Sequence, residues 1–130
     1  MKYITDSIYT EYDENELYSI MVKLSYENTL VGYVRGEICA TLDDFFREIS
    51  ASLRFPRYFG WNFAAFVECM EDLDDWLCFS SILVVIDDFS LMFKGNEYEE
   101  TWKSILKREF ADIEKYWKEN DTEFRYILNR

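Results

Sequence analysis

Four carboxylates follow a short apolar segment at spacings that would place them on one side of a helix. Counted from Ala64, they stand at offsets of four, seven, eight and eleven residues: Glu68, Glu71, Asp72 and Asp75. Like charges three or four residues apart repel each other, so this face costs stability unless a cation relieves it. Two interpretations stay open: a solvated acidic face, or a docking surface for the basic cleft of a partner.

Most catalytic chemistries are excluded by composition. The chain contains no histidine, which removes the commonest general base and every Ser-His or Cys-His nucleophile. Its cysteines, Cys39, Cys69 and Cys78, form no C-x-x-C pair; their spacing does not suit zinc, and an odd number without a secretion signal favours reduced thiols. We therefore expect no metal and no cofactor. Only chemistry with carboxylates alone stays open.

The charge of the whole chain limits the class of partner. The formal net charge is −12, which repels phosphate backbones and argues against direct nucleic-acid binding. The same field would attract a basic protein and speed its capture, although acidity that serves solubility alone explains the charge as well. No run approaches the roughly 18 apolar residues of a membrane span, and the N-terminus lacks a signal-peptide core. We expect a cytoplasmic protein without membrane contact.

An aromatic turn precedes the acidic segment. Tyr58, Phe59 and Trp61 stand around Pro56 and Gly60, the proline being the only one in the chain. Core aromatics normally lie inside periodic segments, and a turn rarely buries three large rings at once. Exposed aromatics beside charges are the usual composition of a binding hot spot, and a rigid turn lowers the entropic cost of binding. We expect Gly60 to supply a sharp bend.

Two helices must position these groups. Thr41 can cap the first, whose apolar stripe is Leu42, Phe45, Phe46, Ile49 and Leu53. Pro56 prevents that helix from continuing, and Asn62 can cap the second. The apolar stripe of the second helix is Phe63, Phe66, Val67 and Met70.

The rest of the chain predicts a parallel sheet. Residues 82–86 form a run of five apolar, mostly β-branched residues, which is typical of a strand buried on both faces. A long helix is predicted over about 97–119, with its stripe from Trp102 to Trp117, and a closing strand over 123–128. Strands and helices in this order indicate an α/β fold with right-handed crossovers. A length of 130 residues fits one such domain.

The N-terminal zone has a different pattern. In residues 18–26, YSIMVKLSY, apolar and polar residues alternate with the period of a half-buried strand. A short turn at 27–29 and a second strand candidate at 30–38 predict an antiparallel hairpin. We therefore divide the chain into an N-terminal extension, 1–29, in the form of a strand or hairpin arm, and a main domain, 30–130. The first dozen residues fit a strand or an ordered arm.

In the aromatic turn and its two flanking helices, the sequence resembles the barstar family of intracellular ribonuclease inhibitors. The resemblance runs from about Val31 to the C-terminus, and its strongest block is TLDDFFREISASLRFPRYFGWNFAAFVECMEDL, with a turn of the form F-P-x-Y-F-G-x-N. It implies a small three-stranded parallel sheet packed with helices. It also implies a protein that plugs a nuclease active site with the second helix and the turn before it.

The resemblance implies a set of partner-binding positions. Glu68 falls where the family has its principal cleft-filling aspartate, while Ala64 replaces a second contact aspartate and Trp61 replaces a polar or charged residue. In the family such carboxylates take the sites of RNA phosphates and pair bidentately with cleft arginines. Close charge pairs can be net favourable at such an interface, as they are between barstar and barnase themselves. The predicted partner-binding residues are Tyr58, Phe59, Gly60, Trp61, Asn62, Ala64, Glu68, Glu71 and Asp72.

Three functions remain in competition. The first is an inhibitor that binds a basic ribonuclease or related nuclease toxin one-to-one, as an immunity protein, without a cofactor. The second is a barstar-fold binding module with a non-nuclease partner, which the lost acid at Ala64 favours. The third is a carboxylate enzyme built on Asp87 and Asp88 at the end of the strand run, where α/β proteins place sites. The missing histidine and the absence of a Gly-rich phosphate loop argue against the third.

Overall fold

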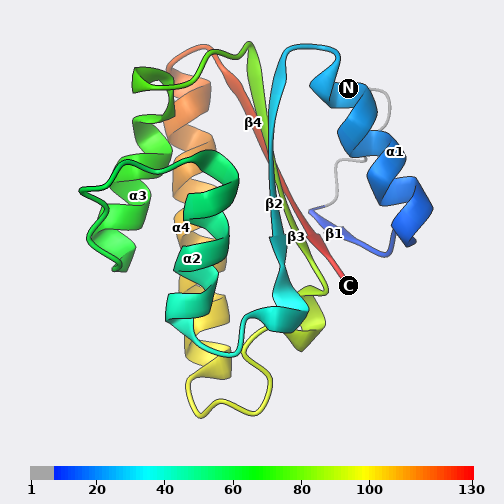
Figure 1. The fold of residues 1–130 in the computed structure, drawn as a ribbon, viewed down its shortest axis with the longest axis vertical. Helices are drawn as coiled ribbons and strands as arrows, with labels where there is room; N and C mark the ends of the chain where they lie inside the picture. Colours follow the sequence, from blue (N-terminus) through cyan, green and yellow to red (C-terminus); the bar gives the residue numbers. More distant parts are fainter. Residues whose placement is uncertain (1–7) are drawn as a thin grey trace.

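The computed structural model describes residues 8–130, and its centre is a parallel β-sheet (Figure 1). The strands are β1 (Tyr9–Thr10), β2 (Thr29–Arg35), β3 (Ser81–Asp87) and β4 (Glu123–Asn129), in the spatial order β1-β4-β3-β2. Every pair is parallel, with Ile82 of β3 opposite Leu30 and Phe124. The predicted α/β class and its parallel sheet are therefore confirmed, but the sheet has four parallel strands where the resemblance implied three.

Helices cover both faces of this sheet. In Figure 1, α2 (Leu42–Leu53), α3 (Phe63–Glu71) and α4 (Glu99–Glu119) lie on one side, and α1 (Glu14–Ser25) lies on the other. Short 3-10 turns follow β2 at Gly36–Ile38, α3 at Leu73–Asp75 and β3 at Phe89–Leu91. Within residues 8–130, no helix combines the length and apolar content that crossing a bilayer requires.

The side chains of strand β3 show why helices cover both faces of the sheet. Ile82–Ile86 are all buried, and successive side chains of a strand point to opposite faces. Ile82, Val84 and Ile86 join the large core cluster, while Leu83 and Val85 join a smaller cluster with Leu17, Ile20 and Leu24 of α1. The continuous apolar run predicted this double burial.

The helix that leads to the aromatic turn is defined at both ends. Thr41 caps α2 in a reciprocal capping box: its hydroxyl accepts the Asp44 N–H at 3.3 Å, and the Asp44 carboxylate accepts the Thr41 N–H at 3.0 Å. The helix stops at Arg54, which adopts a left-handed conformation with φ of 54°. The predicted cap and the predicted stop before Pro56 are both confirmed.

The predicted strand over 18–26 is wrong, because this segment belongs to helix α1. Asp13 caps the helix, its carboxylate accepting the Glu16 N–H at 2.8 Å while Glu16 accepts the Asp13 N–H at 3.1 Å. Leu17, Ile20 and Leu24 are its buried residues. Ile20 and Leu24 are four residues apart, a spacing that fits both a strand and a helix, so the alternating pattern alone was misleading.

The predicted antiparallel hairpin is wrong for the same reason. Both strands of the N-terminal zone are parallel to their neighbours: β1 pairs with β4, and β2 pairs with β3. A helix between two strands carries the chain from one end of the sheet back to the other, which is the connection that parallel strands need. The part of the predicted arm in residues 1–7 lies outside the described residues.

Candidate protein-binding surface

The aromatic turn between α2 and α3 exposes some rings and buries another. Tyr58 and Trp61 are 67% and 43% exposed, whereas Phe59 is only 6% exposed. The Phe59 ring meets Phe46 and Phe55 edge-on, with centroids 5.5 Å and 5.1 Å apart. The Phe59 ring therefore fastens the turn to the core, while the rings of Tyr58 and Trp61 reach solvent.

The bend in this turn is made by Trp61 rather than Gly60. Trp61 has φ of 54°, in the left-handed region that tryptophan rarely adopts. Gly60 is not among the described glycines with positive φ, and a Cβ at Gly60 would meet its nearest neighbours at 3.4–3.5 Å, an ordinary contact. The predicted role of Gly60 is thus corrected. The Trp61 ring is held by Phe59, 5.8 Å away between centroids, and by the Arg47 guanidinium at 5.8 Å.

Helix α3 separates buried from exposed groups as predicted. Asn62 caps it by accepting the Ala65 N–H at 2.8 Å, and Phe66, Cys69 and Met70 are buried. Ala64 and Glu68 are exposed, and Glu71 and Asp72 are half-buried. The Trp117 indole donates to the Met70 carbonyl at 2.9 Å, which fixes the end of α3 against α4.

The helix ends at Glu71, so the predicted carboxylates do not all continue one helical face. Asp72 is the C-terminal cap, and Leu73–Asp75 form a 3-10 turn. Asp75 still contributes to the local charge. Burial, followed by the carboxylates of Asp75 and Glu68, raises the pKa of Asp72 above its ordinary value.

A second helix adds carboxylates that the sequence interpretation did not include. Burial, then Asp72, Asp112 and Glu109, raises the pKa of Glu71, so two acids of α4 lie close to the end of α3. The sequence carried a signal for these two acids. Glu109 and Asp112 stand directly before Phe110 and Ile113, which belong to the buried stripe of α4. We call the combined set the acidic face: Glu68, Glu71, Asp72, Asp74, Asp75, Glu109 and Asp112.

The acidic face is poorly compensated by positive charge. Among residues 8–130, the only ion pair made by one of its members joins Glu109 to Arg108, at 3.2 Å. The Tyr58 hydroxyl lies in the negative field of these carboxylates. Its pKa is raised first by desolvation and then by the charges of Cys69, Asp72, Asp75 and Glu68. Tyr58 of the exposed turn therefore lies in the field of the acidic face, and this combination suits a cationic partner.

The alternative site at Asp87 is occupied by structural hydrogen bonds. One carboxylate oxygen of Asp87 accepts from the Tyr33 hydroxyl at 2.8 Å. The other accepts from the Asn129 amide and from the Asp88 N–H, both at 3.0 Å. These bonds tie β3 to β2 and β4. Within the described residues, no group of acidic or cysteine side chains gathers closely enough to hold a metal ion. Cys39 and Cys69 are buried free thiols, and Cys78 is exposed.

Comparison with known families agrees with this architecture. The family model of barstar, the barnase inhibitor, matches residues 29–129. The chain belongs to the barstar family. The match begins at β2 and ends in β4, so β1 and α1 of this barstar-family protein lie outside it. No curated protein sequence matches the chain significantly.

Proposed function

We propose that this barstar-family protein inhibits a basic ribonuclease or related nuclease toxin by binding it one-to-one and plugging its active site. Tyr58, Trp61 and Asn62 would meet the rim of the cleft, and Glu68 would enter it. Glu71 and Asp72 would supply charge that Ala64 cannot. The protein would act in the cytoplasm of a bacterium as an immunity protein, before the toxin is exported.

The observation that carries the proposal is the unrelieved acidic face beside an exposed aromatic turn. Nuclease clefts bind phosphates with Arg and Lys, so carboxylates at matching positions can pair with the same groups. In the free protein the carboxylates repel one another, and a basic partner would remove that repulsion on binding. The exposed rings of Tyr58 and Trp61 would add contact area at low entropic cost.

The test is inhibition of a ribonuclease encoded beside the gene, measured by RNA cleavage at two salt concentrations and by calorimetry. We expect one-to-one inhibition that weakens at high salt, and that is lost in Glu68→Lys. Glu123→Lys is the matched control, since Glu123 is an exposed glutamate on β4, outside the acidic face. Inhibition that survives in Glu68→Lys, or that both variants lose equally, would contradict the acidic plug.

A second candidate function is a barstar-fold module with a non-nuclease partner, and Ala64 favours it. Loss of one interfacial acid weakens binding to any cleft that keeps its basic groups in place. Ala64→Asp separates the two. If the partner is a nuclease with the usual basic cleft, restoring the carboxylate should tighten binding. If the neighbouring nuclease is bound by neither form, the module interpretation is favoured.

A further inference from the structure

A pocket lies at the carboxyl end of the sheet, and none of its lining residues belongs to the acidic face. All strands are parallel, so β1, β3 and β4 end at the same edge. From this edge the chain leaves β1 toward α1 on one face, and leaves β3 toward α4 on the other (Figure 1). The carboxyl end of β4 therefore lies between the β1–α1 and β3–α4 connections, which leave the sheet on opposite faces. In α/β proteins such a crevice is the usual place for a ligand.

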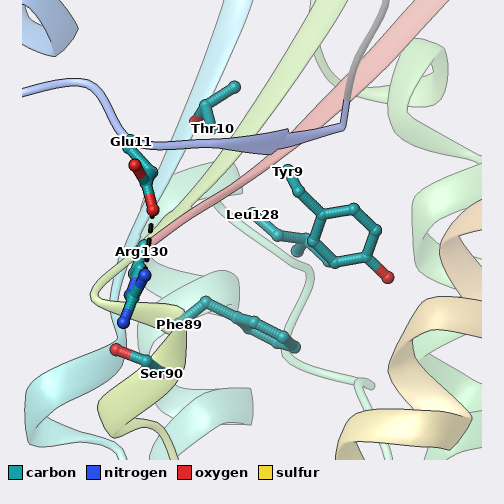
Figure 2. Close-up of a pocket in the computed structure, with 7 residues that line it drawn as sticks. All are labelled: Tyr9, Thr10, Glu11, Phe89, Ser90, Leu128 and Arg130. Atoms are coloured by element: carbon teal, nitrogen blue, oxygen red, sulfur yellow. Dashed lines mark hydrogen bonds and ion pairs between the residues drawn. The ribbon is translucent and has the colours of Figure 1, made fainter.

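The pocket has an apolar side and a charged side. Its volume is about 560 Å³, within the usual range for small-molecule sites. Figure 2 shows the rings of Tyr9 and Phe89 on one side with Leu128, and an ion pair between Glu11 and Arg130 on the other. The lining residues are Tyr9, Thr10, Glu11, Phe89, Ser90, Leu128 and Arg130.

Hydrogen bonds join the two strands that border the pocket, β1 and β4. Asn129, only 2% exposed, accepts from the Thr10 hydroxyl at 2.7 Å and from the Tyr12 N–H at 2.8 Å, and its amide donates to the Tyr12 carbonyl at 3.0 Å. The Arg130 N–H donates to the Thr10 carbonyl at 2.9 Å. These bonds hold β1 against β4, so the pocket exists before any ligand arrives.

Two lysines lie beside the aromatic side of the pocket, although the protein as a whole is strongly acidic. The Lys107 ammonium lies 5.4 Å from the Tyr9 ring centroid and 5.6 Å from that of Phe89, and among the described residues it forms no ion pair. Lys103 also lies over Phe89, at 5.4 Å, although it is paired with Glu99 at 2.9 Å.

The ion pair at the rim can open. Arg130 and Glu11 are 2.9 Å apart, but their side chains are 75% and 73% exposed. Exposed pairs of this kind contribute little to stability, because solvent screens the charges and the side chains lose freedom when they pair. A ligand carboxylate could therefore take the place of Glu11 on the guanidinium at little cost, and would gain a bidentate contact.

We propose that this pocket binds a small molecule that joins one apolar group, the size of an aromatic ring, to a carboxylate. The apolar group lies against Tyr9, Phe89 and Leu128, and the carboxylate binds Arg130 in place of Glu11. The site is separate from the acidic face and does not depend on the function proposed above.

The proposal is tested with three probes that share a phenylethyl group and carry an anionic, a neutral or a cationic head group: phenylpropionate, its amide and phenylpropylamine. Binding to the isotope-labelled full chain is followed by NMR. We expect phenylpropionate to shift the amide signals of Phe89, Ser90 and Leu128, the amide probe to bind more weakly, and the amine not to bind there. Equal binding of all three probes, shifts confined to other parts of the protein, or no shifts at millimolar phenylpropionate would each overturn the proposal.

Variants of exposed residues give effects of opposite sign. Arg130→Gln should weaken phenylpropionate binding about tenfold, whereas Glu11→Gln should strengthen it by removing the competing carboxylate. Ser90→Phe should block the pocket. Arg125→Gln is the matched control, since Arg125 is paired with Glu123 at 3.4 Å on the same strand, outside the pocket. The proposal fails if Arg130→Gln and Arg125→Gln bind alike in spectra that show both are folded.

Discussion

Helices α1 and α3 arrange their charges in opposite ways. In α1, Glu14 and Glu16 stand in the first turn and Lys23 in the last, which is the order that the helix dipole favours. In α3 the first turn holds no acid and the last turn no base; instead Glu68 and Glu71 lie toward the C-terminal end, where the dipole is already negative. The charges of α1 stabilise the fold, and those of α3 oppose it.

This difference separates residues that maintain the structure from residues available for recognition. Helix α1 buries Leu17, Ile20 and Leu24 under a capped first turn, and it lies outside the family match. Helix α3 keeps unfavourable charges beside a tryptophan held in a left-handed conformation. Strain and repulsion at one location are typical of functional sites, where stability is given up for binding.

The largest effect should come from reversing one charge on α3. Glu68→Lys should weaken binding of the proposed nuclease partner at least a hundredfold, because a lost charge pair becomes a repulsion. The same change should slightly raise stability, since a cation suits the end of a helix. Calorimetry and urea unfolding measure the two effects. A variant that binds well, or that unfolds more easily, would contradict the contrast between the helices.

A substitution in the buried face of α1 should affect stability and leave partner binding unchanged. Leu24 is fully buried beneath the sheet, so Leu24→Ala should lower the free energy of unfolding by about 3 kcal/mol. The folded fraction should bind the partner as the wild type does. Tyr18→Ala is the control, because Tyr18 is 65% exposed and its loss should change stability by less than about 0.5 kcal/mol.

Loss of the N-cap of α1 should affect stability alone, whereas loss of the N-cap of α3 should affect stability and partner binding. Asp13→Ala and Asn62→Ala should each cost about 1 kcal/mol of stability, measured by urea unfolding. Asn62 also donates to the Gly60 carbonyl at 3.1 Å, so its loss should loosen the turn and weaken partner binding as well. Equal affinities of the two variants would show that the turn conformation does not matter for binding.

The smallest effect should appear in the pH dependence of stability. The pKa of Asp72 is raised in the folded protein, so its charge destabilises the fold at neutral pH. This cost disappears as the pH falls through the raised folded value toward the ordinary 3.8. Asp72→Asn should therefore gain about 0.3 kcal/mol at pH 7, and the gain should vanish near pH 4. Urea unfolding across this range measures it.

Asp44 should affect the pH dependence of stability in the opposite direction to Asp72. Desolvation would raise its pKa, but hydrogen bonds from Thr41, Ala40 and Arg47 outweigh it, and the pKa lies below 3.8. The stability that Asp44 contributes is thus present at neutral pH and lost as the pH falls through the lowered folded value. Asp44→Asn should destabilise at pH 7. If Asp72→Asn also lowers stability there, the acidic face is not under repulsion.

The sequence by itself determined the elements whose signals are local. The caps at Thr41 and Asn62, the stop before Pro56 and the double burial of 82–86 depend on residues within a few positions of each other, and each was predicted correctly. The same holds for the exposure of Trp61 and Glu68. Local patterns failed at the turn, where Trp61 and not Gly60 takes the left-handed conformation, and in the N-terminal zone, where Ile20 and Leu24 satisfy two periods at once.

The tertiary structure decided what depends on distant segments. It turned the Phe59 ring inward, because Phe46 and Phe55 offer it an apolar site. It brought Glu109 and Asp112 to Glu71 across roughly forty residues of chain, and it joined the ends of β1, β3 and β4 into one pocket. Burial and charge clustering depend on distance in space, which spacing along the chain does not determine.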